Sequence, residues 1–268
     1  MNFKKSLLFC LAVAISSQAN AHSRWLLPSH FSLSSEQGEW IALDATASNE
    51  VFNVDKALSI DALSILTPSG KSVRPSSTYK AHRKSVADYF VKDSGTYKIT
   101  NNASASYFSS YKVADKRHRA RVNKMELKAH APANATELKT MYGLTRVETY
   151  ITMNKPTENY GLEGNFLELH PKTHPSEIVE KEPATFAFTY HGKAQAGVEV
   201  EIMRDGGRYR NNPETLKLTT NNDGEITFTP AQAGRYLLIA EYQQDAKNKA
   251  LADKEHGGIF LTFEAQLQ

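Results

Sequence analysis

His22 holds the position with the most distinctive chemistry in this 268-residue sequence, provided that the mature chain begins there. A first-position histidine offers two nitrogen donors, its imidazole and the free α-amine, whose reference pKa of about 7.7–8.0 lies well below that of lysine. Two such nitrogens suit Cu(II), Ni(II) or Co(II). Arg24 stands at the third mature position, where the square-planar amino-terminal site would need a histidine, so that mode is excluded. His22 is therefore a candidate metal ligand, which a second histidine could complete.

The first 21 residues explain why the mature chain would begin at His22. Lys4 and Lys5 give a positive start, the apolar run 7–15 follows, and Ala19-Asn20-Ala21 ends the segment. This order is typical of a secretory signal peptide and its cleavage site. The apolar run is too short for a membrane-spanning helix, which needs about 20 residues. Residues 1–21 are therefore predicted to be a signal peptide that directs the chain to the periplasm.

Cleavage would also remove Cys10, the only cysteine of the sequence. The mature chain could then form no disulfide and would have no thiolate for catalysis or soft-metal binding. The formal net charge of +3, less the two lysines of the signal peptide, leaves about +1. That weak balance does not indicate a nucleic-acid partner. No later segment is apolar enough to span a membrane, so we expect a soluble protein that is not embedded in one.

Two further histidines, His170 and His174, have the spacing His-x-x-x-His. On a helix this spacing would place both on one face, but Pro171 and Pro175 forbid a regular helix here. His174 is kept as the weaker candidate metal ligand beside His22. The remaining histidines are scattered without ligand-like spacing, and sequence alone does not choose among them: His30, His82, His118, His130, His191 and His256.

A basic run occupies residues 116–121, with the sequence Lys-Arg-His-Arg-Ala-Arg. The usual interpretation of such a run is a solvated loop face. The alternative is a docking surface for an anionic partner, such as an acidic membrane protein, a lipid head group or a carboxylate-bearing chelate. The nearby Tyr107, Phe108 and Tyr111 could form one face of a strand.

Short segments rich in β-branched and aromatic residues predict strands throughout the chain. Turn signals such as Asn222-Asp223-Gly224 separate them, a pattern that favours β-sandwiches. The segments 93–99 and 232–238 repeat one pattern, in which a glycine turn leads to Tyr97 or Tyr236 on a strand. Each tyrosine is expected to form a tyrosine corner, with its ring packed inward and its hydroxyl bonded to the backbone. The clearest strand patterns are 40–43, 62–66, 97–99, 147–151, 185–190, 198–202, 225–229 and 259–263.

The repeat predicts an all-β fold with two Ig-like or transthyretin-like β-sandwich domains in series. Residues 22–157 would form the N-terminal domain and residues 158–268 the C-terminal one, with the joint in 154–164, a stretch with glycines and a proline but no strand pattern. Only 245–254 looks helical, and its polarity indicates a short helix or a surface excursion. Catalytic motifs such as Gly-x-Ser-x-Gly, His-Glu-x-x-His or a phosphate loop do not occur, so we expect no enzymatic activity.

The start of the mature chain, His22-Ser23-Arg24-Trp25-Leu26-Leu27-Pro28, resembles a large family of bacterial periplasmic proteins that carry a domain of unknown function. The family is often described as the periplasmic component of cobalt/nickel uptake systems. Similar segments continue along nearly the whole mature chain, and the last of them are similar to transthyretin-like and carboxypeptidase-regulatory sandwiches. These segments are 45–52, 95–97, 146–151, 167–171, 192–202, 223–224 and 234–236.

This resemblance implies export, two β domains and a role in handling nickel or cobalt, with His22, Trp25 and His174 as the positions of interest. Many members carry a Gly-His-Gly loop after the first strands, whereas this chain has Thr46-Ala47-Ser48-Asn49 there. The leading hypothesis is a non-enzymatic accessory protein that presents a divalent metal or a metal chelate to an inner-membrane transporter or an outer-membrane receptor. The alternatives are a metal-free structural or interaction module of the cell envelope, and a copper carrier or copper oxygenase that uses His22.

Overall fold

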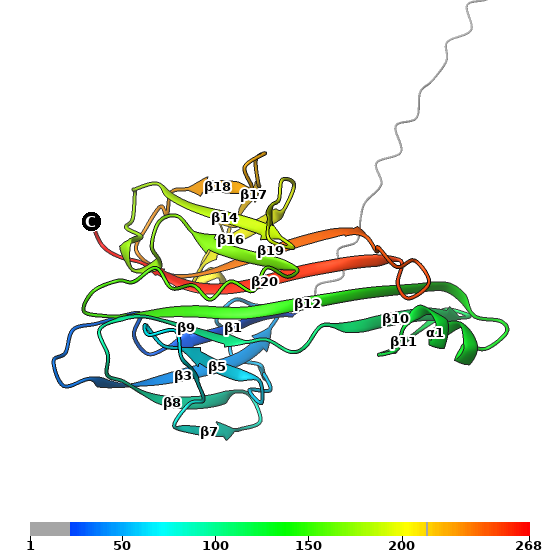
Figure 1. The fold of residues 1–268 in the computed structure, drawn as a ribbon, viewed down its shortest axis with the longest axis horizontal. Coiled ribbons are helices and arrows are strands. Elements are labelled where there is room, and N and C mark those ends of the chain that lie inside the picture. Colours follow the sequence, from blue (N-terminus) through cyan, green and yellow to red (C-terminus); the bar gives the residue numbers. More distant parts are fainter. Residues whose placement is uncertain (1–21, 213) are drawn as a thin grey trace, which may run out of the picture.

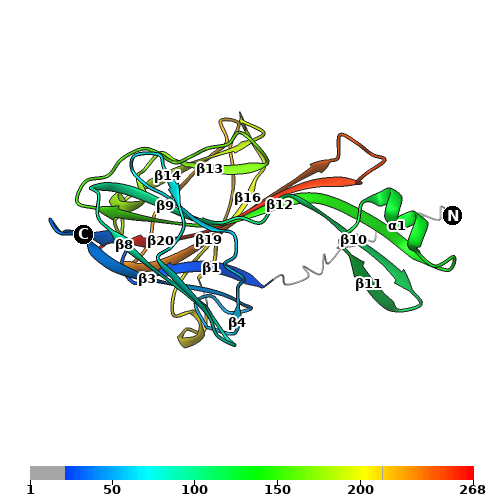
Figure 2. The ribbon, with the colours of Figure 1, turned by 60° about the horizontal axis from the view of Figure 1, so that its bottom comes forward.

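The computed structural model describes residues 22–212 and 214–268, so the predicted signal peptide lies outside the described residues. The described part is nearly all β, in three sheets stacked as layers with one long arm that projects from the body (Figures 1 and 2). The all-β sandwich fold predicted from strand alternation is therefore confirmed. Among the described residues, no helix has both the length and the apolar character needed to cross a bilayer.

The first outer sheet belongs to the N-terminal half and has the order β1-β3-β8-β7, with β4 paired to β3. Its inner face carries Leu26, Ile41, Leu43 and Ala45, which are all buried. Its strands are β1 (Ser23–Pro28), β3 (Glu39–Ser48), β4 (Lys56–Ala57), β7 (Ser77–Lys80) and β8 (Ser85–Val91). We call it the N-terminal outer sheet.

The middle sheet has the order β17-β16-β19-β20-β12-β9-β5-β6, with β2 and β10 also paired to β12 and β11 paired to β10. Its strands are β2 (Ser32–Leu33), β5 (Leu63–Leu66), β6 (Ser72–Val73), β9 (Gly95–Asn101), β10 (Ser106–Val113), β11 (Lys116–Ala120), β12 (Thr136–Met153), β16 (Glu199–Arg204), β17 (Leu216–Thr219), β19 (Gly234–Asp245) and β20 (Lys254–Ala265). The second outer sheet contains β13 (Leu167–Pro171), β14 (Ala184–Tyr190), β15 (Lys193–Ala194) and β18 (Glu225–Phe228).

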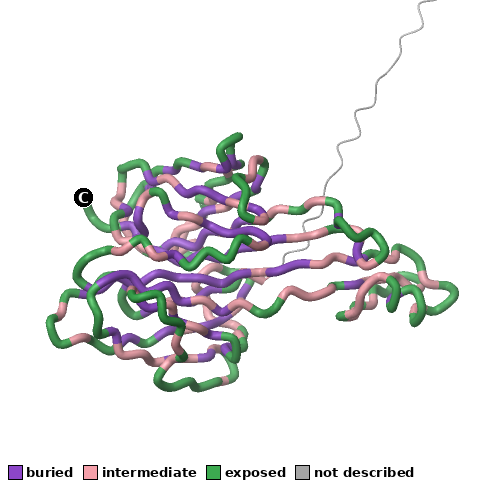
Figure 3. The backbone as a smooth tube through the Cα atoms, viewed as in Figure 1, coloured by how far each residue is buried: buried purple, intermediate pink, exposed green. Residues whose placement is uncertain are grey.

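The middle sheet serves both sandwiches, because alternate side chains of its strands enter different cores. On β20, Ile259 and Leu261 belong to the core beneath the second outer sheet, whereas Phe260 belongs to the core beneath the N-terminal outer sheet. The parallel pairing of β12 with β20, from Met141↔Lys254 to Thr149↔Thr262, joins strands of the two halves directly. Figure 3 shows the resulting buried band along β12 and β20. Residues 154–164 connect β12 to β13 outside any strand.

Four buried charged side chains lie at the joint between the two halves. The ammonium of Lys98 on β9 lies 3.1 Å from the carboxylate of Glu148 on β12. Arg146 on β12 lies 3.5 Å from Glu168 on β13 and donates to the Leu167 carbonyl at 3.1 Å. Arg146 therefore binds β12 to the second outer sheet through both a carboxylate and the backbone. We call Lys98, Arg146, Glu148 and Glu168 the joint cluster.

Both predicted tyrosine corners are confirmed. The Tyr97 hydroxyl donates to the Asp93 carbonyl at 3.0 Å, and the Tyr236 hydroxyl donates to the Gln232 carbonyl. The glycine two residues before each tyrosine has a φ of 134°, a conformation that residues with a Cβ rarely adopt. The weak sequence repeat thus corresponds to the same device in each half.

The structure decides several local expectations. Of the two alternatives for residues 245–254, a short helix or a surface excursion, the structure has the surface excursion, which contains the turn that joins the ends of β19 and β20. The α-helix of the described residues is α1 (Lys124–His130), which begins with a capping box made by Asn123 and Glu126. The basic run at 116–121 is mostly a strand, β11, rather than a loop. Two short 3-10 helices, η1 (Pro175–Glu177) and η2 (Gly207–Tyr209), complete the elements.

The arm is formed by β10, β11, the first half of β12, α1 and the hairpin between β19 and β20 (Figure 2). One of its faces continues the face of the middle sheet that the N-terminal outer sheet covers. The alternation along β20 places His256 and Gly258 on the same face as the core residue Phe260. The N-terminal outer sheet therefore ends over a sheet that continues beyond it, and β1 begins at that edge.

Candidate ligand-binding site at His22

Strand β1 fixes His22 at the edge of the N-terminal outer sheet. Ser23 to Pro28 pair in register with residues 48 to 43 of β3. Leu26 is fully buried and Trp25 nearly so, with the indole packed edge-on against Phe52 at 5.5 Å between ring centroids. The anchoring of these neighbours holds the half-buried His22 in a defined place, although it would be the first residue of the mature chain.

Two cationic side chains lie beside His22 on the same sheet. The Lys56 ammonium lies 3.0 Å from Nε2 of His22 and can donate to that nitrogen. Ala47 on β3 pairs with Lys56 on one side and with Arg24 on the other. Paired residues share a face of a sheet, so Arg24 and Lys56 lie on the inner face, the one directed toward the middle sheet.

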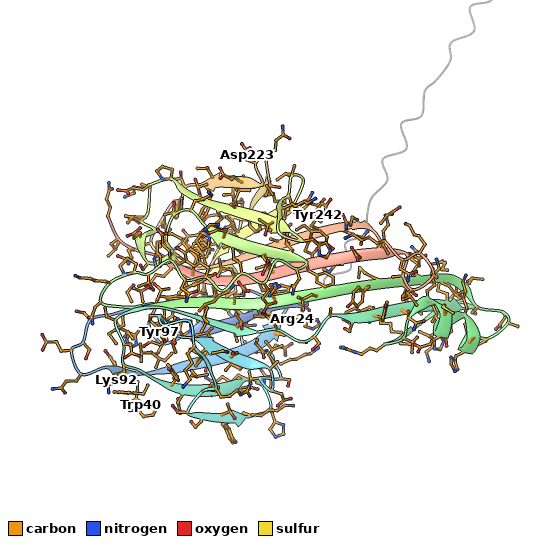
Figure 4. All side chains as sticks on the ribbon, in the orientation of Figure 1. Arg24, Trp40, Lys92, Tyr97, Asp223 and Tyr242 are labelled. Atoms are coloured by element: carbon orange, nitrogen blue, oxygen red, sulfur yellow. The ribbon has the colours of Figure 1, made fainter. Side chains whose placement is uncertain are left out.

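The third cation, Arg121, lies at the base of the arm, close enough to Arg24 for its charge to act on it. The Arg24 guanidinium lies 6.0 Å from the centroid of the Phe260 ring on β20. The Arg121 guanidinium lies 5.1 Å from the centroid of the Phe108 ring on β10. Partial burial, and then the positive charge of Arg121, lower the pKa of Arg24. The labelled Arg24 in Figure 4 marks where the body gives way to the arm. We call His22, Arg24, Lys56 and Arg121 the cationic mouth.

The cationic mouth holds positive charge without compensation. Among the described residues, none of Arg24, Lys56 and Arg121 forms an ion pair with a carboxylate. A crowd of like charges is unfavourable for folding. An anion bound there would be attracted to each cation and would offset their mutual repulsion, so the mouth has the electrostatics of an anion site.

His256 lies further out on the same face of β20, where burial lowers its pKa against a smaller opposing effect of Glu241. Gly143 is paired with it on β12. A Cβ on Gly258 would lie 3.2 Å from Cε1 of His256, so the glycine leaves room for the ring to lie on the sheet. No spacing pattern in the sequence links His256, Lys56 and Arg121, because they come from three separate strands or turns.

The structure does not bring His174 to His22. Nε2 of His174 lies 2.9 Å from Oγ1 of Thr96, and Oγ1 of Thr96 lies 3.1 Å from that of Thr152. Thr152 pairs with Ser32, beyond the far end of β1. The whole of β1, about 20 Å of strand, therefore separates the two histidines.

Both ring nitrogens of His174 are occupied by the fold. Nδ1 accepts from the backbone N–H of Ser176 at 3.1 Å, so the proton of the neutral ring sits on Nε2 and is donated to Thr96. Burial lowers the pKa of this imidazole, which favours the neutral ring that this arrangement needs. Within the described residues, no group of three or more His, Cys, Asp and Glu side chains is placed to hold a metal ion.

The sequence model of the family named Domain of unknown function (DUF4198) matches residues 19–244. The chain belongs to this family. A comparison with curated proteins finds no relative.

Among solved structures, the chain is similar to the Yersinia pseudotuberculosis adhesin InvE, with 10% identity, a TM-score of 0.25, and coverage of 92% of this chain and 61% of the adhesin chain. The D0-D1 domain of Intimin gives 12% identity and a TM-score of 0.24, covering 90% of this chain and 97% of that one. A DUF4785 family protein from Legionella pneumophila gives 9% identity and a TM-score of 0.25, covering 80% and 50%. Such low scores carry no information about function.

Proposed function

We propose that the mature chain is a non-enzymatic periplasmic accessory protein that binds nickel or cobalt as an anionic, carboxylate-bearing chelate at the cationic mouth. His22 would supply the α-amine and imidazole nitrogens, and a membrane uptake system would receive the metal. The observation that supports this most directly is the contact of Lys56 with His22, with Arg24 two residues further along the chain and Arg121 close enough to Arg24 to lower its pKa.

A chelate suits these residues better than a bare ion. Two unit charges about 6 Å apart interact by roughly 3 kcal/mol at an effective dielectric constant of about 20. A bare dication at that distance would meet about twice this repulsion from a neighbouring cation, because it carries two charges, whereas a chelate of net negative charge is attracted. His22 alone offers two donors, and the chelator itself would fill the other coordination positions. His174 is not needed for this site.

The test compares two forms of the mature protein, one that begins at His22 and one with an alanine placed before it. Each is titrated calorimetrically with Ni(II)–citrate, free Ni(II) and metal-free citrate. We expect Ni(II)–citrate to bind the His22-first form, and the added alanine to weaken binding at least about tenfold, which is 1.4 kcal/mol. Citrate alone, which forms no bond to the His22 nitrogens, should bind equally to both forms. Equal Ni(II)–citrate binding by both forms would contradict the role of the free amine.

The processing step has its own test. Mass spectrometry of the exported protein should give a mature chain that begins at His22. Any other first residue would remove the amine–imidazole pair and with it the proposed metal ligand.

A metal-free interaction module is the second candidate, supported by the cationic outer strand of the arm. Among the described strands, β11 pairs only with β10, and Lys116, Arg117 and Arg119 on it are exposed. If neither form binds metal or chelate, this candidate replaces the first.

A further inference from the structure

The exposed face of the N-terminal outer sheet carries an aromatic side chain on a rigid base. Trp40 on β3 is 59% exposed. Its ring lies 5.3 Å from that of Phe90, its partner on β8, at an interplanar angle of 55°. Gly38, at a φ of 85°, lies so close to Phe90 that a Cβ there would come within 2.9 Å of the ring. Trp40 thus stands on a packed strand pair rather than on a loop, and Figure 4 shows it at the surface.

A shallow groove of about 620 Å³ runs beside this indole. Ala42 contributes to its lining, together with polar groups from both flanking strands and the loops next to them. Asp88 accepts a hydrogen bond from the Ser77 hydroxyl at 3.0 Å, so its carboxylate is held in a fixed orientation. The other polar side chains of the groove are Ser29 and Ser76. The groove lining contains no cation.

The composition of the groove selects among possible occupants. Asp88 repels anions such as phosphate head groups or acidic peptides. A purely apolar partner surface would leave the remaining acceptor sites of the Asp88 carboxylate, which already accepts from Ser77, without partners. Burying such polar groups without new hydrogen bonds costs about 1–3 kcal/mol for each group. A sugar ring satisfies both requirements, because its C–H face packs on an indole while its hydroxyls donate to a carboxylate and exchange hydrogen bonds with serines.

A second exposed aromatic extends the same face. Tyr79 on β7 is 69% exposed and pairs with Val86, two residues along β8 from Asp88. Strand spacing places Trp40 and Tyr79 about 16 Å apart across a flat sheet. That span exceeds one sugar ring, so the occupant would be an extended chain of several sugars.

We propose that this face, from Trp40 across Asp88 to Tyr79, is a binding site for an extended, uncharged, β-1,4-linked glycan chain. It lies on the outer face of a sheet whose inner face carries Arg24 and Lys56, so it is independent of the cationic mouth. Such a site would hold the protein against a glycan while the mouth remains free.

The two tryptophans of the sequence give a direct assay, because Trp25 is only 1% exposed and Trp40 is 59% exposed. The mature protein is titrated with the β-1,4-linked hexasaccharide of N-acetylglucosamine, and fluorescence and calorimetry are recorded. We expect a saturable blue shift of the emission, which persists in Trp25→Phe. Maltoheptaose, whose α-linked chain coils, should not bind.

The variants decide the assignment. Trp40→Ala should lose at least about tenfold in affinity by calorimetry, and Asp88→Asn should also bind more weakly. Tyr209→Ala, an 85% exposed aromatic in the other half, is the matched control and should bind as the parent does. Circular dichroism and thermal melting verify that each variant is folded. No saturable binding of the hexasaccharide, unchanged binding by folded Trp40→Ala, or binding of maltoheptaose instead would each overturn the proposal.

Discussion

The joint cluster and the cationic mouth both contain several charged side chains, but the charges of the joint cluster are buried and paired, whereas those of the mouth are exposed and unpaired within the described chain. In the joint cluster, Lys98 and Arg146 are buried and each has a carboxylate within 3.5 Å. In the mouth, Arg24, Lys56 and Arg121 are exposed to solvent and form no ion pair within the described chain. The comparison suggests that compensated charge holds the two halves of this protein together, while uncompensated charge is kept for a ligand.

Arg146→Ala should have the largest effect, because it leaves the carboxylate of Glu168 buried without its cation. We expect the free energy of unfolding to fall by about 3–5 kcal/mol, as measured by urea denaturation. Lys84→Ala, which removes a partly exposed ion pair with Asp44, is the control and should cost less than about 1 kcal/mol. Similar losses in the two variants would show that the joint cluster does not hold the halves together.

The tyrosine corners should give an intermediate loss. Tyr97→Phe removes a hydroxyl that donates to the Asp93 carbonyl and accepts from the Asp93 N–H at 2.8 Å. Loss of this pairing should lower the free energy of unfolding by about 1 kcal/mol. Tyr236→Phe tests the same device in the other half. A loss of stability in one of these two variants but not in the other would show that the two tyrosine corners do not contribute equally to stability.

The buried histidines should make stability depend on pH. The pKa of His174 is lowered by burial in the folded state, so below the unfolded value of about 6.5 the unfolded chain binds more protons. The stabilisation is therefore complete above that pH and is lost as the pH falls below it. His174→Gln, which can still donate to Thr96, should flatten the dependence of the unfolding free energy on pH between 7 and 5.5. An unchanged slope in this variant would be inconsistent with a buried neutral ring.

Arg24→Ala should have the smallest effect on stability, and this sharpens the contrast with Arg146→Ala. The substitution removes the repulsion from Arg121 but also the contact with the Phe260 ring, a contribution of about 0.5–1 kcal/mol. The two effects oppose each other, so the unfolding free energy should change by no more than about 0.5 kcal/mol in either direction. A loss above 2 kcal/mol would mean that Arg24 serves the fold rather than a ligand.

The sequence predicted what local patterns encode. Alternation along segments such as 185–190 identified strands, and the glycine turns before Tyr97 and Tyr236 identified the corners. It missed α1, whose capping signal at Asn123 stands beside a basic run that resembles a loop. The shared middle sheet depends on pairing between β12 and β20, which are more than 100 residues apart, so no local pattern reveals it.

The candidate site was predictable only in part, for the same reason. His22 is conspicuous because of the preceding signal peptide, but its neighbours Lys56 and Arg121 approach it only through strand pairing and the attachment of the arm. His174 was kept as a weaker candidate because of the family resemblance, although its spacing from His170 had already been set aside. That spacing has no meaning outside a helix, and the fold uses both nitrogens of His174 locally.

The most direct test of the account reverses the charge of the mouth. The double variant Arg24→Glu/Arg121→Glu, in the form that begins at His22, is titrated calorimetrically with Ni(II)–citrate and with free Ni(II). The account predicts that binding of the anionic chelate is lost while free Ni(II) binds more tightly than it does to the parent protein. Retained binding of Ni(II)–citrate by the charge-reversed protein would contradict it.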